Sequence, residues 1–448
     1  MSHSLSEKIT HRTAQVGVIG LGYVGLPLAL ACARAGFPTV GLEVNEQRAQ
    51  DVNAAHSYIE DVSDVDLAPH VQAGRLRATT DYDVVRELDI IFICVPTPYT
   101  VQRAPDLVYI IKAAEGIATR LREGQLIVLQ STTYPGTTVE VVRPILEQAS
   151  GLQAGHDFYL AFSPERIDPG NKQWSAYNTP KVVGGLTPES TALAAAFLRQ
   201  TGAPVHEVSS PAAAELTKLL ENTFRAVNIA LVNEIALLAE RMDIDFWEVL
   251  EAAKTKPFGF MPFSPGAGVG GHCIPIDPYY LLWKAREYDF YTRFIELAAE
   301  TNETMPYHVV DLVVKGLSRQ GKPLTGARVL VLGVAFKADI GDARNSPAER
   351  VIELLQGRGA DVRYHDPYVP TYRVGGDVFQ REPLTLHSVA LTDAELAAAD
   401  AVAIVTGHHD VDYARVLAHT SLVVDSCNVT HGLAGGATVI RLGAPLPQ

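Results

Sequence analysis

The feature that most constrains the fold of this chain is a glycine pattern between a predicted strand and a predicted helix. The apolar run from Val16 to Gly20 is typical of a strand buried on both faces, and Tyr23 to Ala35 has the composition of a helix. Glycines between them permit a tight turn, close approach of the backbone to a pyrophosphate, and close helix–strand packing. The pattern predicts a dinucleotide site at the helix N-terminus, formed by Gly20, Gly22, Tyr23, Val24 and Gly25.

An acid after the next predicted strand supports this interpretation. The strand Thr39 to Leu42 leads into Glu43, near the place where an acid about 20 residues after the glycines binds the ribose hydroxyls. A carboxylate there would repel a 2′-phosphate, so we expect NAD rather than NADP as the cofactor. The alternative is a simple tight turn with a solvated Glu43, but strand, glycines, helix and acid agree with one another.

Strand and helix patterns alternate at both ends of the chain. A chain of 448 residues is too long for one ordinary core. We predict an α/β protein with two Rossmann-like, doubly wound domains joined by a long central helix and a helical middle domain. The expected boundaries are residues 1–210 for the NAD-binding domain, 211–320 for the helical domain with a cysteine loop, and 321–448 for the second Rossmann-like domain.

Composition excludes several classes of protein. Hydrophobic residues make up 47% and charged residues 20%, a balance typical of a globular enzyme. The net charge of −14 argues against a nucleic-acid partner. Four scattered cysteines have no metal-ligand spacing, so we expect a reducing compartment and no metal. The sequence has no apolar run of about 18 residues, which a membrane span needs. It also has no apolar segment near its start, which a signal peptide needs, so we expect a cytoplasmic protein.

The segment Gly268 to Pro278 carries the most chemical information. Its clustered glycines place the Cys273 thiol on a backbone that a substrate can approach, and Asp277 follows four residues later. Inert cysteines normally lie within apolar strands or helices, as Cys32 and Cys94 do, whereas Cys273 stands among Gly, His and Pro. We therefore interpret Cys273 as a reactive thiol.

Other polar positions are compatible with a site but do not require one. Lys218 and Asn222, one turn apart on a predicted helix, could stabilise an oxyanion or could form a solvated face. Glu165, after a predicted strand, could be a general base or a surface carboxylate. The remaining candidates follow strands, where ligands of such sheets bind; they are Pro96, Thr97, Ser131 and Thr132 in the first domain, and Lys337 and Arg344 in the last.

Seven motifs together resemble the UDP-glucose/GDP-mannose dehydrogenase family. They occur in order between about Val16 and Asn428, and they are Gly20–Pro27, Cys94–Pro98, Ser131–Gly136, Ser163–Glu165, Lys218–Asn222, Gly270–Cys273 and Phe336–Lys337.

The resemblance implies an NAD-dependent, four-electron oxidation of the C6 alcohol of a UDP-sugar to a carboxylate. Cys273 would add to the aldehyde and carry the thioester, while Lys218 and Asn222 hold the oxyanion and Asp277 holds a water. Glu165 would activate the hydrolytic water, and Thr132 would position that water or the nicotinamide. It also implies that Arg344 contacts NAD, that Glu165, Arg166, Lys218, Asn222, Gly270 and Lys337 contact the substrate, and that the central helix forms a homodimer.

Within the family, the residues from Ser163 to Asn171 and from His272 to Asp277 are similar in sequence to those of the branch that oxidises UDP-N-acetylglucosamine. UDP-glucose and UDP-N-acetylmannosamine are the alternative substrates. Three positions depart from the family pattern. Glu43 replaces the commoner Asp, Gln130 stands where Glu is frequent, and Cys427 replaces an Arg that usually helps to bind substrate.

Two other classes of protein remain as alternatives. A two-electron hydroxy-acid dehydrogenase with the same domain order would not need Cys273. A catalytically silent NAD-binding protein would have no chemical reason to keep Cys273, Lys218, Asn222 and Glu165 together.

Overall fold

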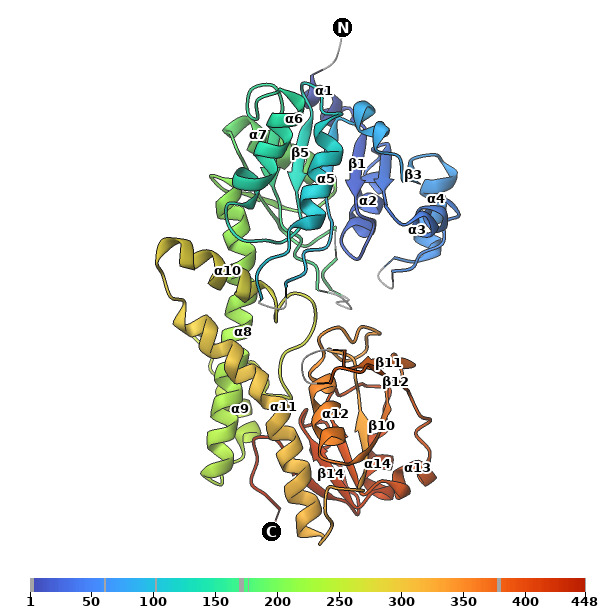
Figure 1. Cartoon of the computed structure of the whole chain (residues 1–448), viewed down its shortest axis with the longest axis vertical. Helices are drawn as coiled ribbons and strands as arrows, with labels where there is room; N and C mark the ends of the chain where they lie inside the picture. Colours follow the sequence, from blue (N-terminus) through green and yellow to red (C-terminus); the bar gives the residue numbers. More distant parts are fainter. Residues whose placement is uncertain are drawn as a thin grey trace. The chain divides into compact units, whose positions relative to one another are not determined.

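The computed structural model describes residues 4–59, 62–100, 103–168, 173–175, 177–376 and 380–447. They form two compact units. The first contains Met1–Glu221 and Tyr279–Phe290, and the second contains Asn222–Pro278 and Tyr291–Gln448. The boundary falls inside helix α8 (Pro211–Arg241), labelled in Figure 1. The division of the sequence into three domains stays a prediction.

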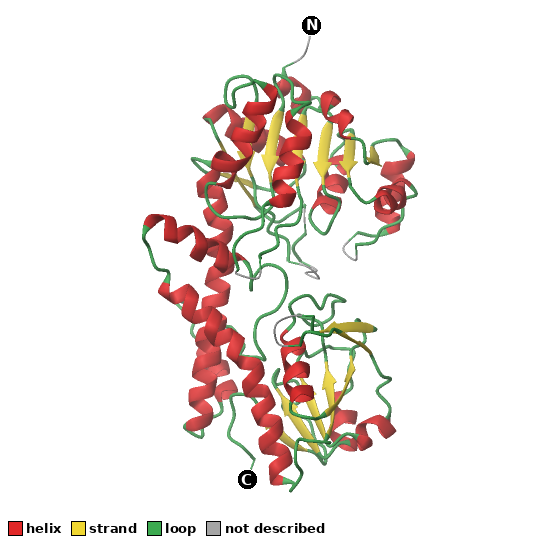
Figure 2. Cartoon of the chain, viewed as in Figure 1, coloured by secondary structure: helices red, strands yellow, loops and turns green. Residues whose placement is uncertain are grey.

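The first unit is built around one eight-stranded sheet, seen as yellow arrows in Figure 2. Its strand order is β3-β2-β1-β4-β5-β6-β7-β8, in which only β6 and β7 pair in antiparallel fashion. The order reverses between β1 and β4, which is the point where such sheets bind ligands. The strands are β1 (Val16–Ile19), β2 (Thr39–Leu42), β3 (Leu76–Thr79), β4 (Ile90–Ile93), β5 (Leu126–Leu129), β6 (Tyr159–Phe162), β7 (Lys181–Gly185) and β8 (Val205–Glu207).

Both faces of this sheet are buried because apolar residues alternate between two cores. On β4, Ile90 and Phe92 belong to one core, and Ile91 and Ile93 belong to the other. Helices α2 and α7 cover the first face, and α5 and α6 cover the second. The helices of the unit are α1 (Leu5–Thr10), α2 (Gly25–Arg34), α3 (Glu46–Asn53), α4 (Asp64–Gln72), α5 (Val108–Ala118), α6 (Arg143–Ser150) and α7 (Pro188–Gln200).

The long central helix predicted from the sequence is confirmed as α8. α8 ends at Arg241, Asp243 adopts a left-handed backbone with φ +60°, and α9 (Phe246–Lys254) begins after the N-cap Asp245. The start of α9 is fixed to the end of the chain, because Trp247 Nε1 donates to Leu442 O at 2.7 Å. The other central helices are α10 (Asp277–Ala285) and α11 (Arg293–Arg319).

The second unit contains a five-stranded parallel sheet with the order β10-β9-β13-β14-β15. Alternation again separates two cores, since Val329 and Val331 of β9 face one core while Leu330 and Leu332 face the other. The fold class predicted from the sequence is thereby confirmed. The elements are β9 (Arg328–Leu332), α12 (Pro347–Gly357), β10 (Asp361–His365), the hairpin β11 (Thr371–Val374) and β12 (Leu384–His387), α13 (Asp393–Ala398), β13 (Ala401–Ile404), α14 (Tyr413–His419), β14 (Leu422–Asp425) and β15 (Thr438–Arg441).

In the described part of the chain, none of the helices combines the length and the apolar character that crossing a bilayer requires.

Asp366, directly after β10, ties together the loops at the carboxyl edge of the second sheet. Its Oδ2 accepts hydrogen bonds from the Val334 and Ala335 N–H groups at 2.7 and 2.9 Å and from His408 Nε2 at 3.0 Å. Burial alone would raise the pKa of Asp366, but the bonds from His408 and the backbone outweigh it and lower that pKa.

We predict that Asp366→Asn lowers the free energy of unfolding of the second unit by about 3 kcal/mol near neutral pH, because an amide cannot accept from all these donors. A carboxyl whose pKa is lowered by folding stabilises above its ordinary value of about 4, and this contribution fades as the pH falls through the lowered value. Calorimetry between pH 3.5 and 7 should therefore show a difference in melting temperature between the native protein and Asp366→Asn, and this difference should become smaller as the pH falls. Asp410→Asn, at an exposed carboxylate of the same unit, is the control. Equal effects of the two variants would contradict the prediction.

Candidate active site

The glycine loop between β1 and α2 has the shape that a dinucleotide pyrophosphate requires. Gly20 has φ +86°, and a Cβ at Gly25 would lie 1.8 Å from Gly20 O, so only glycine fits at Gly25. A Cβ at Gly22 would meet nothing within 4 Å, which leaves open space beside the backbone. The loop therefore fits NAD, with its phosphates at the N-terminus of α2.

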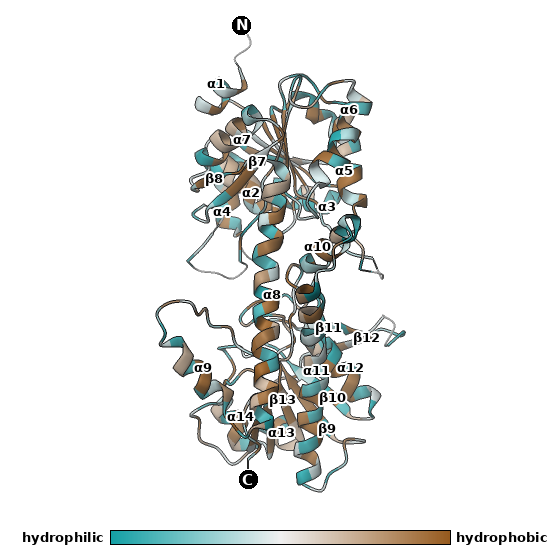
Figure 3. Cartoon of the chain, turned by 90° about the vertical axis from the view of Figure 1, so that its left-hand side faces the viewer, coloured by the Kyte–Doolittle hydropathy of each residue, from teal (hydrophilic) through white to brown (hydrophobic). Residues whose placement is uncertain are grey.

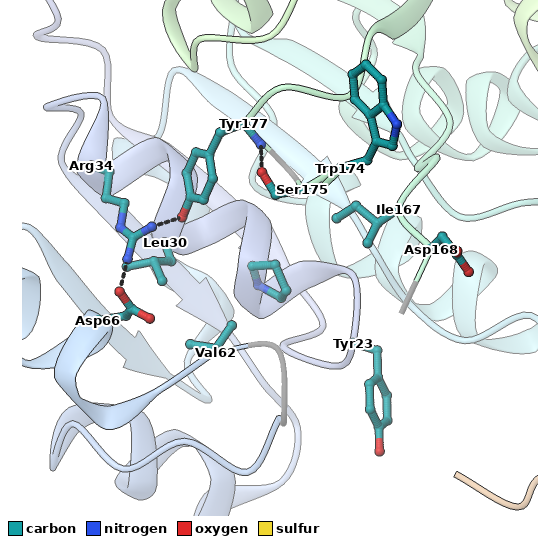
Figure 4. A pocket seen from close by; sticks show the side chains of 11 residues that line it. Tyr23, Leu30, Arg34, Val62, Asp66, Ile167, Asp168, Trp174, Ser175 and Tyr177 are labelled. Atoms are coloured by element: carbon teal, nitrogen blue, oxygen red, sulfur yellow. Dashed lines mark hydrogen bonds and ion pairs between the residues drawn. The ribbon is translucent and has the colours of Figure 1, made fainter. Parts of the chain in front are cut away.

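Glu43 is fixed beside this loop. Its carboxylate accepts hydrogen bonds from Leu21 N and Asn45 N, each at 3.0 Å, and the residue is 6% exposed. The carboxylate thus stands next to the glycine turn, as the ribose-binding position requires. Tyr23 is 44% exposed and lines a pocket of about 150 Å³ on the outer side of α2, in which Arg34 contacts Tyr177 and Asp66 (Figure 4).

Buried contacts hold the segments that follow β4 and β5. Ser131 Oγ donates to Val95 O at 2.8 Å, so the two predicted cofactor-binding segments are joined. Thr132, predicted to position water, is half-buried, as is Thr97, whereas Pro96 is exposed. Beyond them, Glu215 of α8 accepts from Gly136 N at 2.6 Å.

Glu215 also accepts from the N–H and the hydroxyl of Thr138, at 2.9 and 2.7 Å. Burial raises the pKa of this carboxyl, although these hydrogen bonds oppose the shift. Glu215 therefore fixes the turn after β5 through buried hydrogen bonds.

Glu165, predicted as a general base, is not a surface carboxylate. It is 7% exposed and forms an ion pair with Lys181 Nζ, which lies 2.9 Å from Oε2 and 3.2 Å from Oε1. Gln130 Nε2 donates to Oε2 at 2.8 Å. The neighbouring Arg166 points elsewhere, because its guanidinium pairs with Glu221 at 2.5 Å. Residues 169–171, the end of the motif that begins at Ser163, lie outside the described residues.

Asn222 and Asp277 meet in the second unit. Asn222 Nδ2 donates to Asp277 Oδ2 at 2.5 Å, and the two residues are 3% and 2% exposed. This contact orients the Asn222 amide. Lys218, one turn earlier on α8, is 8% exposed, so the predicted pair does not form a solvated helix face.

The loop that carries Cys273 is held from two sides. Gly271 N donates to Arg344 O at 3.0 Å, and Asn345 Nδ2 donates to Gly271 O at 3.0 Å. A Cβ at Gly270 would lie 2.7 Å from Phe336 Cβ and 3.0 Å from Asn345 O. The segment after β9 therefore forms one wall of the cysteine loop.

The second support comes from α8 and α11. Asn233 Oδ1 accepts from Gly266 N at 3.0 Å, while its amide donates to Asn302 Oδ1 at 3.0 Å. Asn302 in turn donates to Ala226 O at 3.1 Å, so the start of the loop is fixed to both helices.

Cys273 differs from Cys32 and Cys94 in its burial. It is half-buried, and its carbonyl accepts from Ile276 N and Asp277 N at 3.0 and 2.8 Å. Cys32 and Cys94 are buried; burial raises the pKa of Cys32 to about 12 and that of Cys94 well above its ordinary value. These two thiols are therefore poor nucleophiles.

Arg344, predicted to contact NAD, forms a close pair with Asp342, with Nη2 2.6 Å from Oδ2, and lies 3.3 Å from His272 Nδ1. Burial would raise the pKa of Asp342, but Arg344 lowers it. Lys337 is half-buried on the same segment after β9. Within the described residues, no group of three or more His, Cys, Asp or Glu side chains could hold a metal ion.

Cys427 lies just beyond β14, where the family pattern suggests an arginine. Its Sγ is 3.2 Å from Val405 O. Burial and the nearby Asp425 raise the pKa of this thiol to about 12, so it stays neutral.

Sequence reasoning missed Lys181, Glu215 and Asn345. The first two are charged residues in buried positions that no local pattern marks. Asn345 carried one available signal, since it precedes Ser346-Pro347 at a helix start, where an Asn readily takes the left-handed conformation that it has here (φ +51°).

Known proteins match the chain along nearly its whole length. Residues 14–201, 212–304 and 330–432 match the NAD binding, central and UDP binding domains of the UDP-glucose/GDP-mannose dehydrogenase family. UDP-N-acetyl-D-glucosamine 6-dehydrogenase of Pseudomonas aeruginosa is 38% identical over 79% of this chain and 83% of that protein. UDP-N-acetyl-D-mannosamine dehydrogenase of Pyrococcus horikoshii is 36% identical over 79% of this chain and 84% of that protein.

Solved structures agree. That of UDP-D-ManNAc dehydrogenase from Pyrococcus horikoshii has a TM-score of 0.87 at 32% identity, over 96% of this chain and 99% of that chain. That of a UDP-glucose dehydrogenase from Pyrobaculum islandicum has a TM-score of 0.80 at 29% identity, over 92% and 94%. The chain belongs to the UDP-glucose/GDP-mannose dehydrogenase family, whose members are NAD-dependent oxidoreductases of nucleotide sugars.

Proposed function

We propose that this protein oxidises the C6 alcohol of a UDP-N-acetylhexosamine to the UDP-uronate, with Cys273 as the covalent nucleophile. One observation carries the proposal: a half-buried thiol stands on a glycine loop fixed by both neighbouring segments, followed by Asp277 bonded to Asn222. Two NAD molecules, bound in turn, would each accept one of the two hydrides that such a four-electron oxidation releases.

Lys218 and Asp277 manage the proton of the alcohol in this proposal. A water held by Asp277 takes the hydroxyl proton as the C6 carbon becomes an aldehyde. The Lys218 ammonium, in a buried position, stabilises the developing negative charge on oxygen.

Cys273 then keeps the aldehyde on the protein. Its thiolate sulfur bonds to the carbonyl carbon, and the carbonyl electrons move to oxygen as an oxyanion. Asn222 donates one amide hydrogen to Asp277, which leaves its other hydrogen to hold this oxyanion together with Lys218. Loss of the second hydride converts the adduct into a thioester.

Glu165 and Thr132 act in the last step. Glu165 takes a proton from a water that Thr132 positions, the water oxygen bonds to the acyl carbon, and the carbon–sulfur bond breaks. The thiolate returns to Cys273, and a uronate is released. Thiolate is a better leaving group than the alkoxide of a serine would be.

Different residues are proposed to bind NAD and the UDP-sugar. Gly20, Gly22, Tyr23, Val24, Gly25, Glu43, Pro96, Thr97, Ser131 and Arg344 would contact NAD. Lys337, Gly270 and Arg166 would contact the UDP-sugar. The relatives named for acetamido sugars favour UDP-N-acetylglucosamine, with UDP-N-acetylmannosamine and UDP-glucose as the alternatives.

We predict two NADH for each UDP-sugar consumed, measured across a panel of UDP-glucose, UDP-N-acetylglucosamine, UDP-N-acetylgalactosamine and UDP-N-acetylmannosamine. One NADH would indicate a two-electron dehydrogenase, and none a silent NAD-binding protein.

Cys273→Ala should abolish uronate release, because no thioester forms. A variant that releases uronate at the native rate would sink the proposal.

The cysteine loop supplies a second prediction. Gly270→Ala should lower kcat about 100-fold, because its Cβ would collide with Phe336 and displace the thiol by a fraction of an ångström or more. The matched control is Gly266→Ala, whose Cβ would have Ser426 O at 3.9 Å as its nearest neighbour. Steady-state kinetics compare the two, and similar turnover by both would show that the fit at Gly270 does not matter.

We also propose a homodimer through α8. Exposed apolar side chains recur on one side of this helix, and Figure 3 shows brown segments along its length. Their steps of four, seven and three residues follow the helical repeat. The residues are Leu216, Leu220, Phe224, Leu231, Ile235 and Leu238.

Light scattering of the native protein should give twice the chain mass of 48.4 kDa, and Leu231→Asp with Leu238→Asp should give the single mass. A native monomer would refute this assembly.

A further inference from the structure

The antiparallel pair in the first sheet brings a buried cation to Glu165. β7 runs against β6, with Phe162 opposite Gly184, so the start of β7 lies where β6 ends. Lys181 opens β7, and Glu165 follows β6 by three residues. Their side chains are 2% and 8% exposed, so this is a desolvated ion pair rather than a surface contact.

Five donor contacts surround the Glu165 carboxylate. Oε2 accepts from Gln130 Nε2 at 2.8 Å and from Lys181 at 2.9 Å. Oε1 accepts from the N–H groups of Arg166 and Ile167 at 2.8 and 3.1 Å and from Lys181 at 3.2 Å. A carboxylate offers about four lone-pair positions, so its orientation is fully determined.

We propose that Lys181 is a positioning residue that, with Gln130, keeps Glu165 ionised and correctly oriented to accept the proton of the hydrolytic water. The inference rests on the proposed function, in which Glu165 serves the hydrolysis of the acyl group. Lys181 spans both oxygens unevenly. Its longer contact, to Oε1, can be exchanged for a water hydrogen while the shorter one, to Oε2, preserves the ion pair. The proton moves from that water to Oε1, and the resulting hydroxide oxygen bonds to the acyl carbon as the sulfur leaves.

Two buried thiols interact with this ion pair, and both are neutral near neutral pH. Cys94 lies 3.6 Å from Gln130 Oε1; burial and the charge of Glu165 raise its pKa well above the ordinary value. Burial raises the pKa of Cys32, which also faces Lys181, to about 12. On the remaining side, the Arg166 guanidinium is paired with Glu221 of α8, and Lys218 of the same helix is buried.

The test separates acyl hydrolysis from the earlier steps by stopped-flow measurement of NADH in the full-length protein. NADH formed before the first hydrolysis reports oxidation, and the later steady rate reports hydrolysis where hydrolysis limits turnover. Lys181→Met removes the cation, and Gln130→Met removes the amide donor to Oε2. In both variants, the pH of half-maximal hydrolysis should rise, by about one unit or more in Lys181→Met, since the loss of an opposite charge or of a hydrogen bond to the carboxylate disfavours its ionised form.

Hydrolysis should also fall more than the initial NADH formation in both variants. Lys181→Arg should return the pH midpoint toward the native value, because it restores the cation. A purely structural role predicts a lower melting temperature with an unmoved midpoint. Gln130→Met keeps the ion pair, so it decides the question if Lys181→Met fails to fold.

An unmoved pH midpoint in Gln130→Met and in any folded Lys181→Met overturns the inference. If the native protein yields two NADH and Glu165→Gln blocks hydrolysis, such a result removes the role of Lys181 alone. If the native protein forms no acyl adduct on Cys273 by intact-mass measurement, the proposed function fails instead.

Discussion

The hydrogen bonds between Gly271 and the segment Arg344–Asn345 are the contacts on which the presentation of Cys273 depends. Gly268 and Gly271 have φ values of +130° and +93°, which side-chain-bearing residues rarely adopt. A loop in such a conformation pays a high entropic cost, so it keeps one shape only where its surroundings determine it. The segment after β9 holds the cysteine loop in this conformation, and it also carries Lys337. The residue proposed to bind the UDP-sugar and the wall of the nucleophile loop therefore belong to one short stretch of chain.

In each unit, the first strand is followed by a similar glycine turn that is hydrogen-bonded to an acid. The other partners of this acid differ between the two units. Gly20 and Gly333 follow β1 and β9 with φ of +86° and +80°. In each unit, an acid after the second strand accepts from the N–H that follows this glycine: Glu43 from Leu21, and Asp366 from Val334. Glu43 has two backbone donors, which leaves acceptor capacity for ribose hydroxyls.

Asp366, in contrast, accepts from four backbone N–H groups and from His408, so its capacity is filled by the protein itself. A similar turn and acid are therefore proposed to hold NAD in the first unit, whereas in the second unit the acid is occupied by donors of the protein itself.

Sequence patterns predicted the elements whose residues all face apolar surroundings. β1, expected from Val16 to Gly20, and β2, expected from Thr39 to Leu42, have bounds that differ from expectation by one residue at most. β3, with two of four residues buried, and the hairpin β11–β12, with several exposed positions, gave no such signal. The site followed the same rule. Glycine spacing marked the NAD loop because its constraints are local, whereas the partners of Glu165 come from separate strands and appear only when the sheet is assembled.

The electrostatics of the protein explain how an acidic chain can serve an anionic ligand. The net charge of −14 repels a UDP-sugar at long range, so binding energy must come from groups at close distance, where screening is weak. Backbone N–H groups at the start of α2 provide part of this on the NAD side. On the UDP side, Cys427 places a neutral thiol where the family pattern has a guanidinium, so the proposed site depends more on Lys337. Selectivity in such a site comes from the geometry of close contacts rather than from the overall field of the protein.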